Sequence, residues 1–241
     1  MEKYTFEPLQ KGIDICVSPE HKFGTDAFLL ADFSSPRHKD KVCDLGTGCG
    51  IIPLLLKIKF EPELVYGVDI QEQAIDQFRT TLERNKLDGL VPVLGDLKAL
   101  GDKVPKGSFD VVTCNPPYKA ANAGIESLGE AQRIARHEIL CNINDVCRTA
   151  SGLLKFGGKL CICNRPERLA DVISAMKSNR IEPKTLRFVA KDHSCSPWLF
   201  LIEGKLGGKP FMKVLPTLAV KEGDGFSEEL LGIYGGDKNG Y

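Results

Sequence analysis

The sequence predicts an α/β fold built around a mostly parallel sheet. Strand-like and helix-like segments alternate through the middle of the 241 residues, as in successive βαβ units. A glycine-rich turn follows the first of these strands, and an Asp or Asn stands at or just beyond the end of each of the next three. Ligands of such sheets bind at the carboxyl ends of the strands, so this edge is the expected site.

The first half of the chain alternates short apolar runs with helical segments. The apolar run that opens from the glycine turn predicts a buried helix, and Ala74, Ile75 and Phe78 recur at helical spacing in the next one. Strands are expected at Lys41–Leu45, Leu64–Val68, Val91–Leu94 and Phe109–Cys114, and helices at Ile51–Lys59 and Gln71–Asn85.

The second half begins with residues 119–130, which are polar and lack periodicity, as in a loop over the carboxyl edge. A one-sided apolar pattern predicts a helix over Glu138–Leu154 that is ended by Gly157 and Gly158. Pro166 fits the first turn of a further helix, where its missing N–H is tolerated. The last two strands are expected to pair antiparallel, which gives a seven-stranded sheet with an antiparallel edge strand. These later strands are Lys159–Cys163, Lys184–Ala190 and Trp198–Glu203.

Composition and charge narrow the class of protein. The chain is 42% hydrophobic and 27% charged with zero formal net charge, so no global electrostatic field indicates a nucleic-acid partner, although a local basic face is compatible with neutrality. Nine cysteines, an odd number without paired C-x-x-C spacing, predict reduced buried thiols in the cytoplasm and no zinc site. No apolar stretch is long enough to span a bilayer, so no membrane partner is expected.

The glycine turn runs from Asp44 to Gly50 and reads D-x-G-x-G-x-G. Its third glycine comes one place too early for the dinucleotide fingerprint, and no Lys-Ser/Thr follows, as a phosphate loop would require. Both differences favour a ligand without a pyrophosphate. The pattern resembles the first motif of class I methyltransferases, where the loop wraps the methionine end of S-adenosylmethionine. Asp69 is then placed to accept hydrogen bonds from the ribose hydroxyls, and Asp96 to reach the adenine amine.

Asn115-Pro116-Pro117-Tyr118 follows the fourth strand. Two prolines stiffen the backbone, so the side-chain oxygen of Asn115 and the carbonyl of Pro116 can converge as two acceptors. A planar amine with two N–H donors fits between them, and Tyr118 can stack on a flat substrate. The tetrapeptide by itself therefore predicts a site that holds the amine of a nucleobase or of a glutamine side chain between two acceptors, and the methyl donor is implied by the resemblance of the glycine turn.

These residues resemble the amino-methyltransferase branch of the class I methyltransferases, which have a Rossmann-like fold. Within this branch, roughly residues 10–220 are similar to the bacterial family that methylates N6 of adenine 37 in a valine tRNA. Phe23–Leu30 matches that family's G-T-D-x-x-L-L segment, and Ile134–Glu138 and Arg165–Leu169 fit its later blocks. The resemblance implies an S-adenosylmethionine-dependent N-methyltransferase that releases S-adenosylhomocysteine and acts on RNA, with tRNA as the expected substrate.

The resemblance and the motifs together divide the chain and assign its site. Residues 1–40 are expected to form an extension that closes over the cofactor, residues 41–220 the methyltransferase domain and residues 221–241 a C-terminal tail. Catalytic roles fall to Asn115, Pro116, Pro117 and Tyr118, and no metal is expected. The expected cofactor contacts are Thr25, Asp26, Asp44, Gly46, Thr47, Gly48, Gly50, Asp69, Ile70, Asp96, Leu97 and Asn115. The candidate RNA contacts are Lys119, Arg133, Arg136, Arg165, Arg168 and Arg187.

Three other functions stay open at this point. Guanine-N2 methyltransferases of ribosomal RNA share the chemistry but often carry a duplicated or extra domain. Glutamine-N5 methyltransferases of release factors share Asn-Pro-Pro-Tyr but usually carry an N-terminal helical domain, whereas only about 40 residues precede the glycine motif in this chain. A catalytically silent module that binds the cofactor and organises RNA or protein partners is the third. The sequence specifies neither the nucleotide modified nor the oligomeric state.

Overall fold

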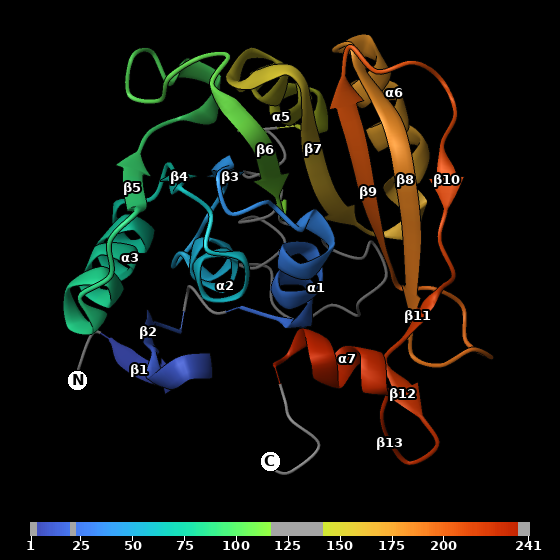
Figure 1. Cartoon of the computed structure of the whole chain (residues 1–241), viewed down its shortest axis with the longest axis horizontal. Helices are drawn as coiled ribbons and strands as arrows, with labels where there is room; N and C mark the ends of the chain where they lie inside the picture. The colour runs from blue at the N-terminus through green and yellow to red at the C-terminus, as the bar shows by residue number, and fades with distance from the viewer. Residues whose placement is uncertain (1–3, 20–22, 117–141, 236–241) are drawn as a thin grey trace, which may run out of the picture.

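The computed structural model describes residues 4–19, 23–116 and 142–235. Within them, a central sheet of nine strands runs in the order β10-β8-β9-β7-β6-β3-β4-β5, and β11 also pairs with β8 (Figure 1). Its strands are β3 (Lys41–Leu45), β4 (Leu64–Asp69), β5 (Leu90–Leu94), β6 (Phe109–Cys114), β7 (Leu154–Asn164), β8 (Ile181–Ala190), β9 (Leu199–Leu206), β10 (Lys213–Val214) and β11 (Leu218–Ala219).

The sheet is parallel apart from β9, which pairs antiparallel with both β7 and β8. The predicted Rossmann-like class I fold, with its mostly parallel sheet and antiparallel pair, is thus confirmed. The structure adds one detail: β9 is the third strand from the edge, after β10 and β8, and β8 is the outermost long strand.

Helices cover both faces of the sheet and produce two apolar clusters. Leu30, Leu54 and Phe78 belong to the first cluster, under α1, α2 and α3. Val146 and Met176 belong to the second, under α5 and α6. The helices are α1 (Thr25–Ser34), α2 (Ile51–Phe60), α3 (Glu72–Asn85), α5 (Ile143–Leu153), α6 (Leu169–Ser178) and α7 (Glu228–Ile233), with 3₁₀ turns η1 (Gln10–Gly12), η2 (Leu97–Ala99) and η3 (Pro166–Arg168).

The end of α5 differs from the prediction. The helix ends at Leu153 and β7 begins at the next residue, so Gly157 and Gly158 lie inside the strand instead of ending the helix. The register between β6 and β7 shifts there, because several extra residues of β7 bulge out between two paired positions. Gly157 adopts φ 81°, and a Cβ on Gly158 would come within 3.0 Å of a β6 carbonyl. Both glycines therefore serve the bulge.

The N-terminal segment forms a hairpin of β1 (Thr5–Pro8) and β2 (Asp14–Val17) that packs against α3. The Thr81 hydroxyl accepts a hydrogen bond from the Cys16 backbone N–H at 2.9 Å, and Arg84 forms an ion pair with Asp14 at 2.9 Å. The hairpin is thus fixed to the main body by the helix that follows β4.

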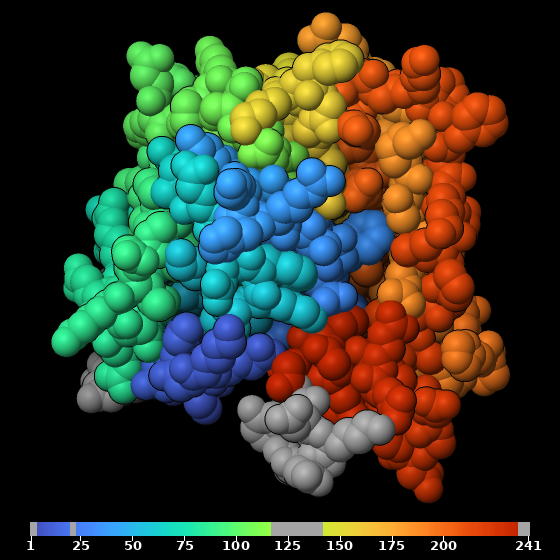
Figure 2. All heavy atoms as spheres, in the orientation of Figure 1, coloured from blue at the N-terminus to red at the C-terminus, as the bar shows by residue number. Residues whose placement is uncertain are grey.

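The expected C-terminal tail has regular structure over the part that is described, residues 221–235. A small hairpin of β12 (Lys221–Glu222) and β13 (Gly225–Phe226) leads into α7, which buries Leu230 and Ile233. Ser227 caps this helix by accepting a hydrogen bond from the backbone N–H of Leu230. Figure 2 shows the C-terminal helix beside the N-terminal hairpin, where the Gln10 side chain donates to the Tyr234 carbonyl.

No helix in the three described ranges is both long and apolar enough to cross a membrane.

Candidate active site

Most of the predicted site residues in the described ranges gather at one edge of the sheet. The carboxyl ends of β3, β4 and β6 carry the glycine turn, Asp69 and Asn115, and α1 starts beside them at Thr25. Parallel pairing of β3 with both β4 and β6 brings these three strand ends together. Pro117 and Tyr118 of the tetrapeptide, with Lys119, Arg133 and Arg136, lie outside the described residues.

The glycine turn needs its glycines for backbone geometry. Gly46, Gly48 and Gly50 all have positive φ, at 75°, 55° and 86°, a region that other residues avoid. A Cβ on Gly50 would also overlap the ring of Phe78. The turn is held by Asp69, whose carboxylate accepts a hydrogen bond from the Gly48 N–H at 2.9 Å.

Asp69 is 7% exposed and uses both of its oxygens for backbone contacts. One oxygen bonds Gly48 and the other accepts from the Gln71 N–H at 2.9 Å, at the start of α3. A carboxylate oxygen can accept more than one hydrogen bond, so Asp69 retains acceptor capacity for hydroxyl groups next to the turn.

Asp44 is fully buried beneath the turn. One of its oxygens accepts a hydrogen bond of 2.6 Å from the Thr113 hydroxyl, and the other has no hydrogen-bond partner among the described residues. Burial raises the pKa of this carboxyl to about 7, the Thr113 and Thr47 hydroxyls oppose the rise, and the charge of Asp69 adds to it. A buried carboxylate oxygen without a partner at this position fits a ligand that brings a positive charge.

Asp96, Leu97 and Ile70 line the same edge farther out. Asp96 caps η2 by accepting from the Lys98 N–H at 2.9 Å, and its side chain is 38% exposed. Ile70 follows Asp69 and is 50% exposed, so it offers an apolar surface beside the polar strand ends. Such a surface suits the flat face of an adenine ring.

Asn115 is held at both ends of its side-chain amide. Its Nδ2 donates to Asp26 Oδ2 at 3.0 Å, and its Oδ1 accepts from the Cys163 thiol at 3.1 Å. The sequence predicts Asp26 as a cofactor contact, but in the structure its carboxylate contacts the amide that is predicted to bind the methyl acceptor. Cys163 was expected only as a buried apolar residue. Cys114 is paired with Ile162, so the next residue of β7, Cys163, lies beside Asn115. This contact can be predicted only when β6 and β7 are known to be neighbours.

Thr25 joins this corner to the C-terminal helix. Its hydroxyl accepts a hydrogen bond from the Tyr234 hydroxyl at 2.8 Å, and the Tyr234 ring packs on Phe28 with ring centroids 4.7 Å apart. The start of α1 is therefore anchored by residues more than two hundred positions away in the sequence.

The three described RNA candidates have different surroundings. Arg165 donates to the Trp198 carbonyl at 3.2 Å and lies over its ring, whereas Arg168 forms an ion pair with Asp171 at 3.0 Å. Arg187 makes a two-point ion pair with Glu229 of α7 at 2.6 and 2.8 Å and is 16% exposed. The side chain of Arg168 is 46% exposed, whereas that of Arg187 is mostly buried and engages both oxygens of its carboxylate partner, so Arg187 is less accessible to a phosphate than Arg168.

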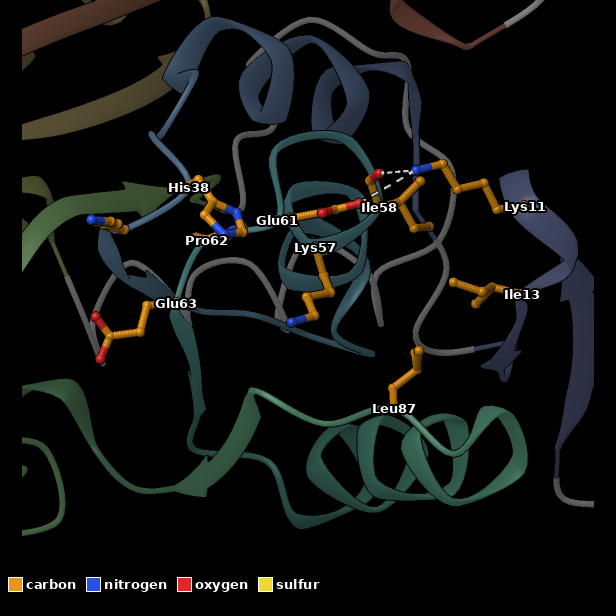
Figure 3. A pocket seen from close by; sticks show the side chains of 10 residues that line it. Lys11, Ile13, His38, Lys57, Ile58, Glu61, Pro62, Glu63 and Leu87 are labelled. Atoms are coloured by element: carbon orange, nitrogen blue, oxygen red, sulfur yellow. Dashed lines mark hydrogen bonds and ion pairs between the residues drawn. The ribbon is translucent and has the colours of Figure 1, made fainter.

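A cavity of about 540 Å³ lies at the opposite edge of the sheet (Figure 3). Its lining comes from the end of α2, from the turns that precede β3, β4 and β5, and from Lys11 and Ile13 of the N-terminal hairpin. Ligands of doubly wound sheets bind at the carboxyl edge, so this amino-edge cavity is separate from the candidate site. No group of three or more His, Cys, Asp or Glu side chains that could hold a metal was found in the described part of the chain.

Comparison with known proteins agrees with this arrangement. Residues 20–179 match the methyltransferase small domain family. The chain belongs to this family. Its predicted membership of the class I methyltransferases is thereby confirmed, and the match supports S-adenosylmethionine as the cofactor that the glycine turn and Asp44 suit.

Two of the similar proteins are named as RNA methyltransferases. The chain is 26% identical over 161 residues to the tRNA1(Val) (adenine(37)-N6)-methyltransferase of Histophilus somni, which covers 66% of each chain. It is 31% identical over 143 residues to the ribosomal RNA small subunit methyltransferase C of Actinobacillus pleuropneumoniae, or 59% of this chain and 38% of that one. The chain thus spans just under two thirds of the length of the first relative and 38% of the length of the second. The crystal structure of a predicted O-methyltransferase from Agrobacterium tumefaciens shares the fold, with a TM-score of 0.71, 20% identity and coverage of 87% of this chain and 95% of that one.

Proposed function

We propose that this protein transfers the methyl group of S-adenosylmethionine to the exocyclic N6 amine of an adenine in tRNA. The observation that carries the proposal is the corner at the end of β6, where the fixed amide of Asn115 lies next to the glycine turn. S-adenosylhomocysteine would be the second product, and the free thiols of the described cysteines are compatible with the reducing cytoplasm predicted from the sequence.

The proposed cofactor site follows the order of the strand ends. Asp44 would face the ammonium of the methionine moiety with its unpartnered oxygen. Asp69 would accept from the ribose hydroxyls, and the exposed side chain of Ile70 would lie against the adenine, with Asp96 near its amine. The glycine turn would approach the methionine end closely because it presents no side chains there.

The proposed acceptor site uses the free acceptor capacity of Asn115. Among the described residues, the donor to its Oδ1 is the weak Cys163 thiol, so the second lone pair can accept from one N–H of the substrate amine. The Pro116 carbonyl would take the other N–H. These two acceptors hold the nitrogen lone pair toward the methyl group and stabilise the positive charge that develops on nitrogen.

When bound, the cofactor would supply an electrophilic methyl carbon, which would leave sulfur as the positioned nitrogen takes it up. The nitrogen then carries one proton too many and loses it to solvent, because a methylated cationic amine of this kind is strongly acidic. The chain's own contribution is to position the amine and exclude competing orientations. Adenine in structured RNA would first have to leave its base stack.

Two observations support a second candidate for the methyl acceptor, the N2 amine of a guanine in ribosomal RNA. Part of the chain matches a ribosomal RNA methyltransferase, and a pair of acceptors also fits the N2 amine of guanine. We favour adenine because the match to the tRNA family covers more of this chain, at 66% against 59%. Arg165 and Arg168 flank the start of α6 and are two of the described candidates for RNA phosphate contacts.

The deciding experiment uses the whole protein with methyl-labelled S-adenosylmethionine and, separately, bulk tRNA, ribosomal RNA and release factor. Label recovered as N6-methyladenosine from tRNA is the expected result. Label only in N2-methylguanosine or in methylglutamine would replace the proposed acceptor with one of the alternatives.

The role of Asn115 is tested by Asn115→Ala, which should lose turnover by at least about 100-fold while cofactor binding measured by calorimetry stays within about threefold. Asn179→Ala removes a hydrogen-bonded amide at the end of α6 and serves as the matched control. Equal loss of turnover and cofactor affinity in Asn115→Ala would assign Asn115 to the cofactor instead.

A further inference from the structure

The side-chain amide of Asn115 has a defined orientation because of the groups around it. Asp26 can only accept hydrogen bonds when ionised, so the amide nitrogen must face it. The amide oxygen then faces Cys163, whose thiol donates to it at 3.1 Å. Three elements meet here: the first turn of α1, the end of β6 and the end of β7.

The carboxylate of Asp26 is itself held in place. Its Oδ1 accepts from the Ala27 N–H at 3.1 Å, which leaves Oδ2 directed at Asn115. Gly24 makes room for this conformation, since a Cβ there would lie 2.7 Å from Asp26 Oδ1. A normal contact with a carboxylate oxygen is longer, so any side chain at position 24 would displace the carboxylate.

Cys163 is fully buried, and its thiol can donate a hydrogen bond to the Asn115 oxygen without occupying both lone pairs of that oxygen. Burial raises the pKa of its thiol well above the ordinary value, and the nearby carboxylates of Asp26 and Asp44 raise it further, so it carries its proton at neutral pH. A thiol is a weak donor that takes one lone pair of the amide oxygen and leaves the other available.

We infer that Asp26 and Cys163 are positioning residues that orient the Asn115 amide so that its oxygen faces the methyl acceptor. Asp26 also strengthens that oxygen as an acceptor, because a charge on the N–H side of an amide polarises it toward the oxygen. The inference rests on the proposed function only in taking Asn115 as the acceptor-binding amide; it holds for any amine that is methylated.

The first test compares Asp26→Ala with Asp32→Ala. Both residues are acids of α1, but Asp32 forms an ion pair with Lys59 away from the site. Asp26→Ala should lower kcat by about 10–100-fold, with cofactor affinity within about threefold of wild type, and Asp32→Ala should change neither. Unchanged kcat in Asp26→Ala would overturn the inference. Cofactor affinity that falls in parallel with kcat would overturn it as well and return Asp26 to the cofactor site.

Two further variants separate positioning from packing. Cys163→Ala removes the donor and should lower kcat by about 3–10-fold, whereas Cys163→Ser keeps a donor and should restore most of it. Thermal unfolding of both checks that they fold. A serine variant that is folded but as slow as the alanine variant would show that the sulfur acts through packing. Gly24→Ala should reproduce the kcat loss of Asp26→Ala without removing the carboxylate.

A readout without turnover keeps this inference distinct from the proposed function. The Asn115 side-chain NH₂ pair in a ¹H–¹⁵N spectrum is identified as the pair lost in Asn115→Ser. It should move in Asp26→Ala and stay fixed in Asp32→Ala. If wild-type protein methylates no RNA and the pair still moves, the proposed function fails while the orientation of the amide stands. An unmoved pair overturns the orientation itself.

Discussion

Replacing the buried Asp44 by Asn should stabilise the free protein at alkaline pH and weaken its binding of the cofactor. Asp44 is fully buried, and its pKa rises from the ordinary 3.8 to about 7, chiefly because burial disfavours the charged form. Between pH 4 and pH 7, roughly, the native state keeps the proton of Asp44, whereas the unfolded chain has released it. Stability from this group therefore falls as pH rises from about 4 to 7.

The magnitude follows from the two pKa values. Each tenfold change in proton affinity is worth about 1.4 kcal/mol, so ionisation of Asp44 costs the native state up to about 4 kcal/mol above pH 7. Asn keeps an oxygen that can accept from Thr113 but adds an NH₂ group that needs a partner. We expect Asp44→Asn to raise the free energy of unfolding at pH 8 by about 2–4 kcal/mol and to have little effect at pH 4.

Urea unfolding of the cofactor-free protein across pH 4–8 measures this difference, and calorimetry measures the cofactor. Loss of one charge-assisted hydrogen bond should cost cofactor binding about 1.5–3 kcal/mol. Asp110→Asn is the control with the opposite sign. Although burial raises the pKa of Asp110, hydrogen bonds from the Lys41 N–H and from Lys155 lower it overall, so its stabilising effect is present at neutral pH and lost in acid. A stability gain in Asp44→Asn that is equal at pH 4 and pH 8, or no gain, would refute the reasoning.

Three further substitutions test other parts of the structure. Asp69→Ala should weaken cofactor binding by about 1.5–3 kcal/mol in calorimetry, and unchanged affinity would remove Asp69 from the site. Gly50→Ala should lower the free energy of unfolding by about 2–4 kcal/mol in urea, because it combines a positive φ with overlap of the Phe78 ring. Gly223 also has a positive φ but lies in open space, so Gly223→Ala should lower the free energy of unfolding by only about 1 kcal/mol. If both variants lost the same free energy of unfolding, overlap with the Phe78 ring would not be the cause. Arg187→Ala should cost about 1 kcal/mol of stability with the KM for RNA unchanged, whereas a raised KM would place Arg187 on the RNA surface.

Local sequence patterns predicted the elements of the parallel sheet because each strand and helix carries its own apolar spacing. They failed where a feature depends on distant residues. The bulge at Gly157 exists because β7 must match the register of β6, and α7 is stable because it packs on α1. The sequence of a short helix with a weak apolar pattern does not indicate which distant element it packs against.

The candidate site shows the same division. The glycine turn and Asp69 are recognisable from spacing, since both are fixed within one βαβ unit. Cys163 lies 48 positions from Asn115, and its contact becomes visible only once β6 and β7 are known to be neighbours. Asp26 was selected by its motif, but its partner could not be inferred because nothing in the sequence says which strand end α1 approaches.

The bond between Tyr234 and Thr25 also has a consequence for how the protein is made. The two residues are 209 positions apart. Translation at roughly 5–20 residues per second separates their synthesis by roughly 10–40 seconds. During that interval the sheet and the glycine turn can form on the ribosome, but the start of α1, with Asp26 in its first turn, still lacks its anchor. The acceptor corner would then be the last part of the catalytic centre to mature, and a nascent chain could bind the cofactor before it can methylate.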